Sequence, residues 1–331
     1  MQHADGMDGR DAAASDVVPA EAVGPDAGAA GFESWPDGSA HAPWDPAEAA
    51  PTTDRGEAAA VGFEPWPDSS VHVEWGATGA ALAADRGDVV VVVDVLSFST
   101  TLSLAVSRDF TCLVYSGAEI ESLGGPAMAA IRLGARPLSR RRTSDPGQLS
   151  LSPASLLGAE PGQRVVFTSL NGATVVSAAA KAPALLIGAP RNATACALLA
   201  AELMVATRAG RVTVVACGEH WCSIEPGVVG ARPAVEDWLG AGAISAGLAD
   251  LGYSLSAEAR IAAAAWRNPT AREDLADCVS AAELRAAGFA LDVELALKVD
   301  ADDKVPVRMP GEQTGRVFLG VAPQPAAEEE D

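Results

Sequence analysis

Five consecutive valines, Val89 to Val93, constrain the fold of this chain more than any other stretch. β-branched side chains favour strands over helices, and five residues are too few to cross a bilayer. Since the run has no polar alternation, it predicts a strand buried on both faces, as in the centre of a parallel sheet. The run ends at Asp94, and a hydroxyl-rich turn leads into an apolar helix expected at Leu102–Val106. Open α/β sheets bind ligands at such turns, where the helix start offers backbone N–H groups to an anion.

The same order of strand, polar turn and apolar helix recurs along the chain. Buried strands are predicted at Arg164–Thr168 and Arg211–Cys217, and each is followed by a glycine-containing turn. Strands that alternate with helices at this spacing predict an α/β fold, a layered α/β/α arrangement with a largely parallel sheet. The other predicted strands are Val71–Trp75, Thr111–Tyr115, Ala184–Gly188 and Lys304–Arg308.

Composition divides the chain into three parts. Residues 1–68 are rich in Ala, Gly, Pro, Asp and Glu, contain only two basic residues, and predict a disordered acidic tail. Residues 69–320 carry the apolar periodicity of a folded α/β domain, and residues 321–331 form a second acidic tail. The pattern GFExWPDxSxHxxW occurs twice, at Gly31–Trp44 and at Gly62–Trp75. The repeat indicates either a local duplication of which only the second copy joins the fold, or a peptide that competes with the second copy for its docking site.

Charge and cysteine content limit the classes of partner. A net charge of −21 argues against binding to nucleic acid or to an anionic membrane, because both need a basic surface. No stretch is long and apolar enough to span a membrane, and the first residues do not resemble a signal peptide. The five cysteines contain no CxxC pair, which favours a reduced protein in the cytoplasm. These features are compatible with a homo-oligomer.

Polar side chains are expected to gather at the carboxyl ends of the buried strands. Asp94, Asn171 and Gly218 each follow a strand, and such ends meet at one edge of a parallel sheet. The first turn of a later predicted helix carries Glu236 and Asp237. Carboxylate oxygens suit Mg²⁺, so the pattern favours magnesium-assisted phosphate chemistry. The alternative is that Asp94 caps a strand and Asn171 belongs to an ordinary turn.

Four sequence blocks, in order and with matching spacing, resemble the 2-phosphosulfolactate phosphatase family of coenzyme M biosynthesis. The resemblance covers about residues 71–318, and it is specific because the blocks occur together. They are DVLSFSTT (Asp94–Thr101), FTSLNGA (Phe167–Ala173), IGAPRNA (Ile187–Ala193), and VVACG followed by EDWLGAGAIS (Glu236–Ser245).

The resemblance implies a Mg²⁺-dependent phosphoric monoester hydrolase that converts 2-phosphosulfolactate, a small anionic phosphate ester, to sulfolactate and phosphate. The site predicted from the resemblance and from the turn has three groups of residues. They are catalytic Asp94, Asn171 and Glu236; substrate-binding Ser97, Ser99, Thr100, Thr101, Gly172 and Asn192; and the metal ligands Asp94, Glu236 and Asp237. The attacking nucleophile is either water or the Asp94 carboxylate.

The chain departs from the common family pattern at two places. Ser97 stands where the family usually has an arginine, and Ser150–Pro153 stands where it has Gly-Asn-Ser-Pro. An arginine binds an anion through two parallel hydrogen bonds. With serine in its place, we expect the sulfonate of the substrate to be bound differently. Arg140–Arg142, the one basic cluster, is an alternative source of that charge, or else a solvated loop. A second hypothesis is therefore a non-catalytic or substrate-shifted member that binds an anionic metabolite.

Overall fold

The computed structural model describes residues 70–139, 141, 148–221, 224–225, 227–228, 230–309 and 316–324. The strands are β1 (Val71–Trp75), β2 (Val89–Val93), β3 (Thr111–Val114), β4 (Arg136–Pro137), β5 (Arg164–Phe167), β6 (Leu185–Gly188), β7 (Val212–Ala216), β8 (Glu219–His220), β9 (Ala231–Arg232), β10 (Val305–Arg308) and β11 (Val317–Val321). The α-helices are α1 (Gly76–Arg86), α2 (Phe98–Ser107), α3 (Gly117–Ser122), α4 (Gly125–Arg132), α5 (Gly172–Ala178), α6 (Ala193–Ala206), α7 (Val235–Asp250), α8 (Ala257–Trp266), α9 (Ala271–Asp277), α10 (Val279–Ala286) and α11 (Ala290–Ala296). The predicted tails and the first copy of the repeat lie outside the described residues.

In the described part of the chain, nine strands join into one sheet in the order β1-β7-β2-β6-β10-β11-β3-β5-β4. β1, β7, β2 and β6 pair in parallel, and so do β3, β5 and β4. β10 and β11 form an antiparallel pair that sits between these two groups. The predicted α/β fold with a largely parallel sheet is confirmed, and the antiparallel insert is what the sequence did not predict.

The five valines of β2 are fully buried between β6 and β7. Val89, Val91 and Val93 face a core shared with α6 and α7, whereas Val90 and Val92 face a core shared with α1, α2 and α5. Helices therefore cover both faces of the sheet, which confirms the predicted α/β/α layers. Burial of each valine contributes about 1.5–3 kcal/mol, so β2 anchors both cores.

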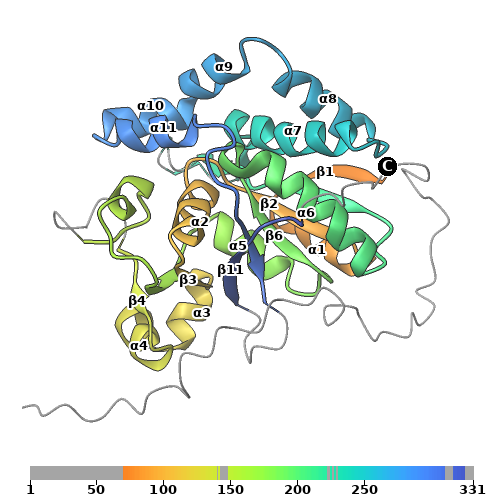
Figure 1. Cartoon of the computed structure of the whole chain (residues 1–331). Coiled ribbons are helices and arrows are strands. Elements are labelled where there is room, and N and C mark those ends of the chain that lie inside the picture. The colour runs from red at the N-terminus through yellow and green to blue at the C-terminus, as the bar shows by residue number, and fades with distance from the viewer. Residues whose placement is uncertain are drawn as a thin grey trace, which may run out of the picture. The chain divides into compact units, whose positions relative to one another are not determined.

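A further layer of helices covers α7. A side chain on Gly242 of α7 would lie 2.1 Å from the carbonyl oxygen of Ala262 in α8, so the glycine permits close helix contact. Figure 1 shows α8, α9, α10 and α11 following α7 across the same side of the sheet. α8 was not predicted from the sequence, because its alanine-rich stretch gives little contrast between an apolar and a polar face.

The helix after β2 begins at Phe98, four residues earlier than the start expected at Leu102. His72 in β1 is buried, because helices pack over both faces of the strand. None of the described helices is long and apolar enough to cross a membrane.

Candidate functional site

Asp94 lies directly after β2 and joins two helix starts. Its Oδ1 accepts the N–H of Phe98 at the start of α2 at 3.2 Å, and its Oδ2 accepts the N–H of Gly172 at the start of α5 at 3.0 Å. A side chain on Gly172 would lie 2.2 Å from the Phe98 ring and 2.9 Å from Asp94 Oδ2, so only glycine fits there. The chain after β5 thus returns to the end of β2, although β5 is far from β2 in the order of the sheet.

The surroundings of Asp94 hold an excess of negative charge. Burial raises the pKa of Asp94, the carboxylates of Glu219 and Glu236 raise it further, and the two N–H bonds offset part of the effect, so that the pKa reaches about 7. Burial and the nearby carboxylates of Asp94 and Glu236 also raise the pKa of Asp237. Buried carboxylates that raise one another's pKa favour a cation or a shared proton as their counterpart.

Glu219 and Asn171 face each other beside Asp94. Asn171 Nδ2 donates a hydrogen bond of 2.7 Å to Glu219 Oε2, which joins the turn after β5 to the turn after β7. Gly218 makes the second turn possible, because its φ of +71° lies in the left-handed region. Sequence reasoning missed Glu219, although its position just after a buried strand was the available signal.

Asp94, Ser97, Asn171 and Glu219 all line one cavity of about 600 Å³. The volume lies in the range typical of sites for small molecules. Three of these residues, Asp94, Ser97 and Asn171, were predicted from the sequence to belong to the site. The cavity wall also includes Arg141, Glu121 and a set of apolar side chains.

The hydroxyl groups of Ser99, Thr100 and Thr101 point to the main chain. Each residue is fully buried and none lines the cavity. Ser99 Oγ accepts the N–H of Asp94 at 2.8 Å, and Thr100 Oγ1 donates to the carbonyl of Val95 at 2.7 Å. Thr101 Oγ1 donates to two main-chain carbonyls. These residues shape the turn, while their contact with a substrate stays a prediction.

Asn192 also serves the backbone. It occupies the N-cap position of α6, but its side chain makes no capping bond to that helix. Instead, Oδ1 accepts the N–H of Ala189 at 2.9 Å and Nδ2 donates to the carbonyl of Ile187 at 3.2 Å. Asn192 is fully buried and is not part of the cavity wall, so it fixes the turn after β6.

Asp237 ties the ends of β2 and β7 together. Its Oδ1 accepts the N–H of Val95 at 2.7 Å, and its Oδ2 accepts the N–H of Gly218 at 2.9 Å. Glu236 is buried beside it and is not on the cavity wall. Within the described residues, no three or more His, Cys, Asp or Glu side chains form a group that could hold a metal ion. The predicted set of three ligands is therefore not seen as one cluster, although an all-oxygen donor set suits Mg²⁺.

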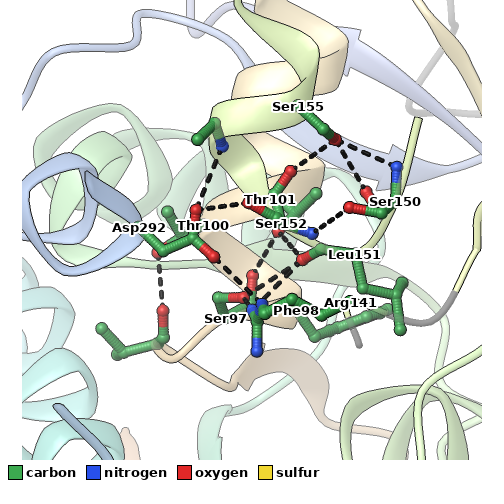
Figure 2. A network of polar contacts seen from close by, with 12 residues as sticks. Ser97, Phe98, Thr100, Thr101, Arg141, Ser150, Leu151, Ser152, Ser155 and Asp292 are labelled. Atoms are coloured by element: carbon green, nitrogen blue, oxygen red, sulfur yellow. Dashed lines mark hydrogen bonds and ion pairs between the residues drawn. The ribbon is translucent and has the colours of Figure 1, made fainter. Parts of the chain in front are cut away.

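Ser97 belongs to a polar network that Figure 2 shows from close by. Its Oγ donates to the carbonyl of Leu151 at 3.2 Å and accepts a hydrogen bond from Arg141 Nη2. Arg141 Nε lies 3.0 Å from Asp292 Oδ2, and Asp292 also accepts hydrogen bonds from the Ser152 hydroxyl and the Ala154 N–H. The two places where the chain departs from the family pattern are thus in direct contact.

Comparison with known proteins identifies a family for this chain. The model of a family described as 2-phosphosulpholactate phosphatase matches residues 79–310, which is more than half of the chain. The match includes every predicted site residue and all four of the blocks quoted above. A comparison with curated proteins finds no match. The chain belongs to the 2-phosphosulfolactate phosphatase family.

Proposed function

We propose that this protein is a Mg²⁺-dependent phosphatase that hydrolyses a small phosphorylated 2-hydroxy acid, with 2-phosphosulfolactate as the first substrate to test. The observation that carries the proposal is the placement of Asp94, Asn171 and Glu219 on one wall of a cavity of about 600 Å³. A carboxylate pair and an amide donor are what phosphoryl transfer needs from a protein when a metal ion shares the charge.

Asp94 and Glu219 are the residues that would hold Mg²⁺, because both line the cavity and the carboxylate of Glu219 raises the pKa of Asp94. Glu236 lies behind them and adds negative charge, and Asp237 positions the two strand ends. When bound, Mg²⁺ would polarise a phosphoryl oxygen of the substrate. Asn171 holds Glu219 in place and presents its amide to the same cavity.

The proposed function includes two alternative mechanisms of hydrolysis, which differ in the attacking nucleophile. In the first, a water attacks phosphorus and the ester oxygen leaves with a proton. In the second, a carboxylate oxygen of Asp94 attacks phosphorus, the alcohol leaves, and water then cleaves the acyl phosphate and restores Asp94. Acid quenching during turnover followed by mass measurement separates the routes, since only the second leaves phosphate on the Asp94 peptide.

The function is tested by phosphate release from 2-phosphosulfolactate by the full-length protein, with Mg²⁺ and after chelation by EDTA. We expect turnover with Mg²⁺, loss of turnover with EDTA, and recovery when Mg²⁺ is returned. Binding of 2-phosphosulfolactate with no turnover under any of these conditions would instead identify a non-catalytic member of the family.

The proposed location is a reducing compartment such as the cytoplasm. The described cysteines Cys112, Cys196, Cys217 and Cys278 are free and buried, which supports this proposal.

A further inference from the structure

Arg141 is the one basic side chain among the described residues that line the cavity of about 600 Å³. The other ionisable groups on that wall are the carboxylates of Asp94, Glu121 and Glu219. A substrate that carries a phosphate and a second anionic group would meet repulsion from three carboxylates. A metal ion offsets that repulsion only near the phosphoryl group, so the second anion needs a cation of its own.

The guanidinium of Arg141 is held at the cavity from three sides. Asp292 is fully buried and pairs with Nε at 3.0 Å, and the carbonyl of Leu151 accepts from Nη2 at 3.3 Å. The Phe289 ring lies 5.4 Å below the guanidinium carbon, within range of a cation–π contact. An arginine fixed in this way loses little conformational freedom when it binds a ligand.

Ser97 marks the side of the guanidinium that meets the cavity. Both Ser97 and Arg141 line the cavity, and Nη2 of Arg141 donates to Ser97 Oγ (Figure 2). Arg141 also lines a neighbouring cavity of about 180 Å³ and forms part of the wall between the two. An anionic oxygen next to Ser97 would therefore lie beside a guanidinium that is already fixed in place.

We propose that Arg141 is the residue that determines specificity for substrates with a second anionic group, a sulfonate or a carboxylate, in addition to the phosphate. This inference rests on the proposed function and adds to it a residue from outside the predicted strand-end site. Asp292 acts as a positioning residue, because it holds Nε and thereby orients the guanidinium.

The test compares two phosphate esters, 2-phosphosulfolactate and propyl phosphate, whose tail is uncharged. We expect Arg141→Gln to raise KM for 2-phosphosulfolactate by about ten- to a hundredfold, the range for a lost charge-assisted hydrogen bond, with kcat within about threefold. KM for propyl phosphate should stay within about threefold. Arg132→Gln, on the exposed surface of α4, is the matched control for lost charge and should leave both esters unaffected.

Two further variants separate specificity from folding. Arg141→Gln leaves Asp292 buried without its cation, so the double variant Arg141→Gln, Asp292→Asn removes that cost and should melt like the natural protein. Arg141→Lys keeps a charge and should recover part of the preference for the sulfonate. The pair Ser97→Arg, Arg141→Ser moves the guanidinium to the adjacent position and should also recover part of it.

Direct binding keeps this inference separate from the proposed function. Titration calorimetry with sulfolactate needs no turnover, and we expect Arg141→Gln to weaken binding by at least about tenfold, whether or not the protein proves to be a phosphatase. If sulfolactate binds equally to the natural protein and to the folded double variant, the inference is overturned. Equal losses of kcat/KM for both esters in Arg141→Gln would overturn it as well.

Discussion

Gly172 is the residue whose substitution should show most directly how tightly the site is packed. The added methyl group of Gly172→Ala would lie 2.2 Å from the Phe98 ring and 2.9 Å from Asp94 Oδ2, and one of the two must move. We expect a loss of about 1–3 kcal/mol in the free energy of unfolding and a fall of at least about tenfold in kcat/KM. Urea unfolding and phosphate release measure the two effects.

Gly158→Ala is the matched control for this substitution, because a side chain there would meet nothing within 4 Å. It should leave both measurements unchanged. A fully active and fully stable Gly172→Ala variant would show that the contact between α5 and Asp94 is looser than described.

A substitution of Asp94 should lower the phosphatase activity strongly and leave the stability of the fold nearly unchanged. Asp94→Asn keeps the size and one hydrogen-bond acceptor but removes the charge, and we expect phosphate release to fall at least about 100-fold. Since the change also removes a buried charge next to Glu219 and Glu236, the melting temperature should stay within about 4 °C. Asp303→Asn, on the surface, is the control. An active Asp94→Asn protein would assign Asp94 a structural role.

Residues of the site were predictable from the sequence where they come shortly after a buried strand. Asp94 and Asn171 follow buried strands, and both reach the cavity. The sequence pointed to Arg141 only as one member of the basic cluster Arg140–Arg142. It gave no sign of Asp292, because their contact joins residues far apart in the sequence and leaves no local pattern. The hydroxyl-rich turn was visible in the sequence, but the direction of its hydroxyl groups depends on nearby carbonyls that only the fold brings close.

At the scale of elements, Glu119 joins α3 to two other parts of the fold. It accepts hydrogen bonds from Ser116 and from Ser177 of α5, and it pairs with Arg316 before β11. Burial alone would raise the pKa of Glu119, but these hydrogen bonds and the charge of Arg316 outweigh it and lower the pKa below its ordinary value. A lowered pKa in the folded state stabilises the fold above the unfolded pKa of about 4.3, and the contribution is lost as pH falls through the folded value.

We therefore expect Glu119→Gln to lower the free energy of unfolding by about 1–2 kcal/mol at pH 7, and by less at pH 3 to 4. Urea unfolding at a series of pH values measures the difference. Glu160→Gln, on an exposed loop, should show no such dependence. A difference that stays constant down to pH 3 would contradict the assigned role of the charge.

The parallel strands β2, β3, β5, β6 and β7 were predictable because each is a short apolar run between turn residues. The parallel strand β4 was missed, because its two residues are exposed and form no apolar run. β11 was missed, and β10 was not recognised as antiparallel, since the position of this pair between β6 and β3 depends on contacts across the whole domain. The prediction that strand ends meet at one edge assumed neighbouring strands. In the structure, α5 brings the turn after β5 to Asp94 by packing on α1 and β2.

For the whole molecule, the composition of the first 68 residues predicts that they add little to folding. They contain few aliphatic side chains, and burial of so little apolar surface cannot repay the entropy of ordering the chain. We propose that the folded domain begins near residue 69, and we expect removal of residues 1–60 to leave the melting temperature and phosphate release unchanged.

The matched control removes residues 1–75 and takes β1 as well. β1 pairs in parallel with β7, and Val71 is fully buried in the core on one face of the sheet. Loss of this strand exposes the edge of β7 and the apolar surface of α8, so we expect a protein that is insoluble or melts at least about 10 °C lower. If removal of residues 1–60 already has this effect, those residues contribute to the fold, and the prediction that the acidic tail is dispensable is wrong.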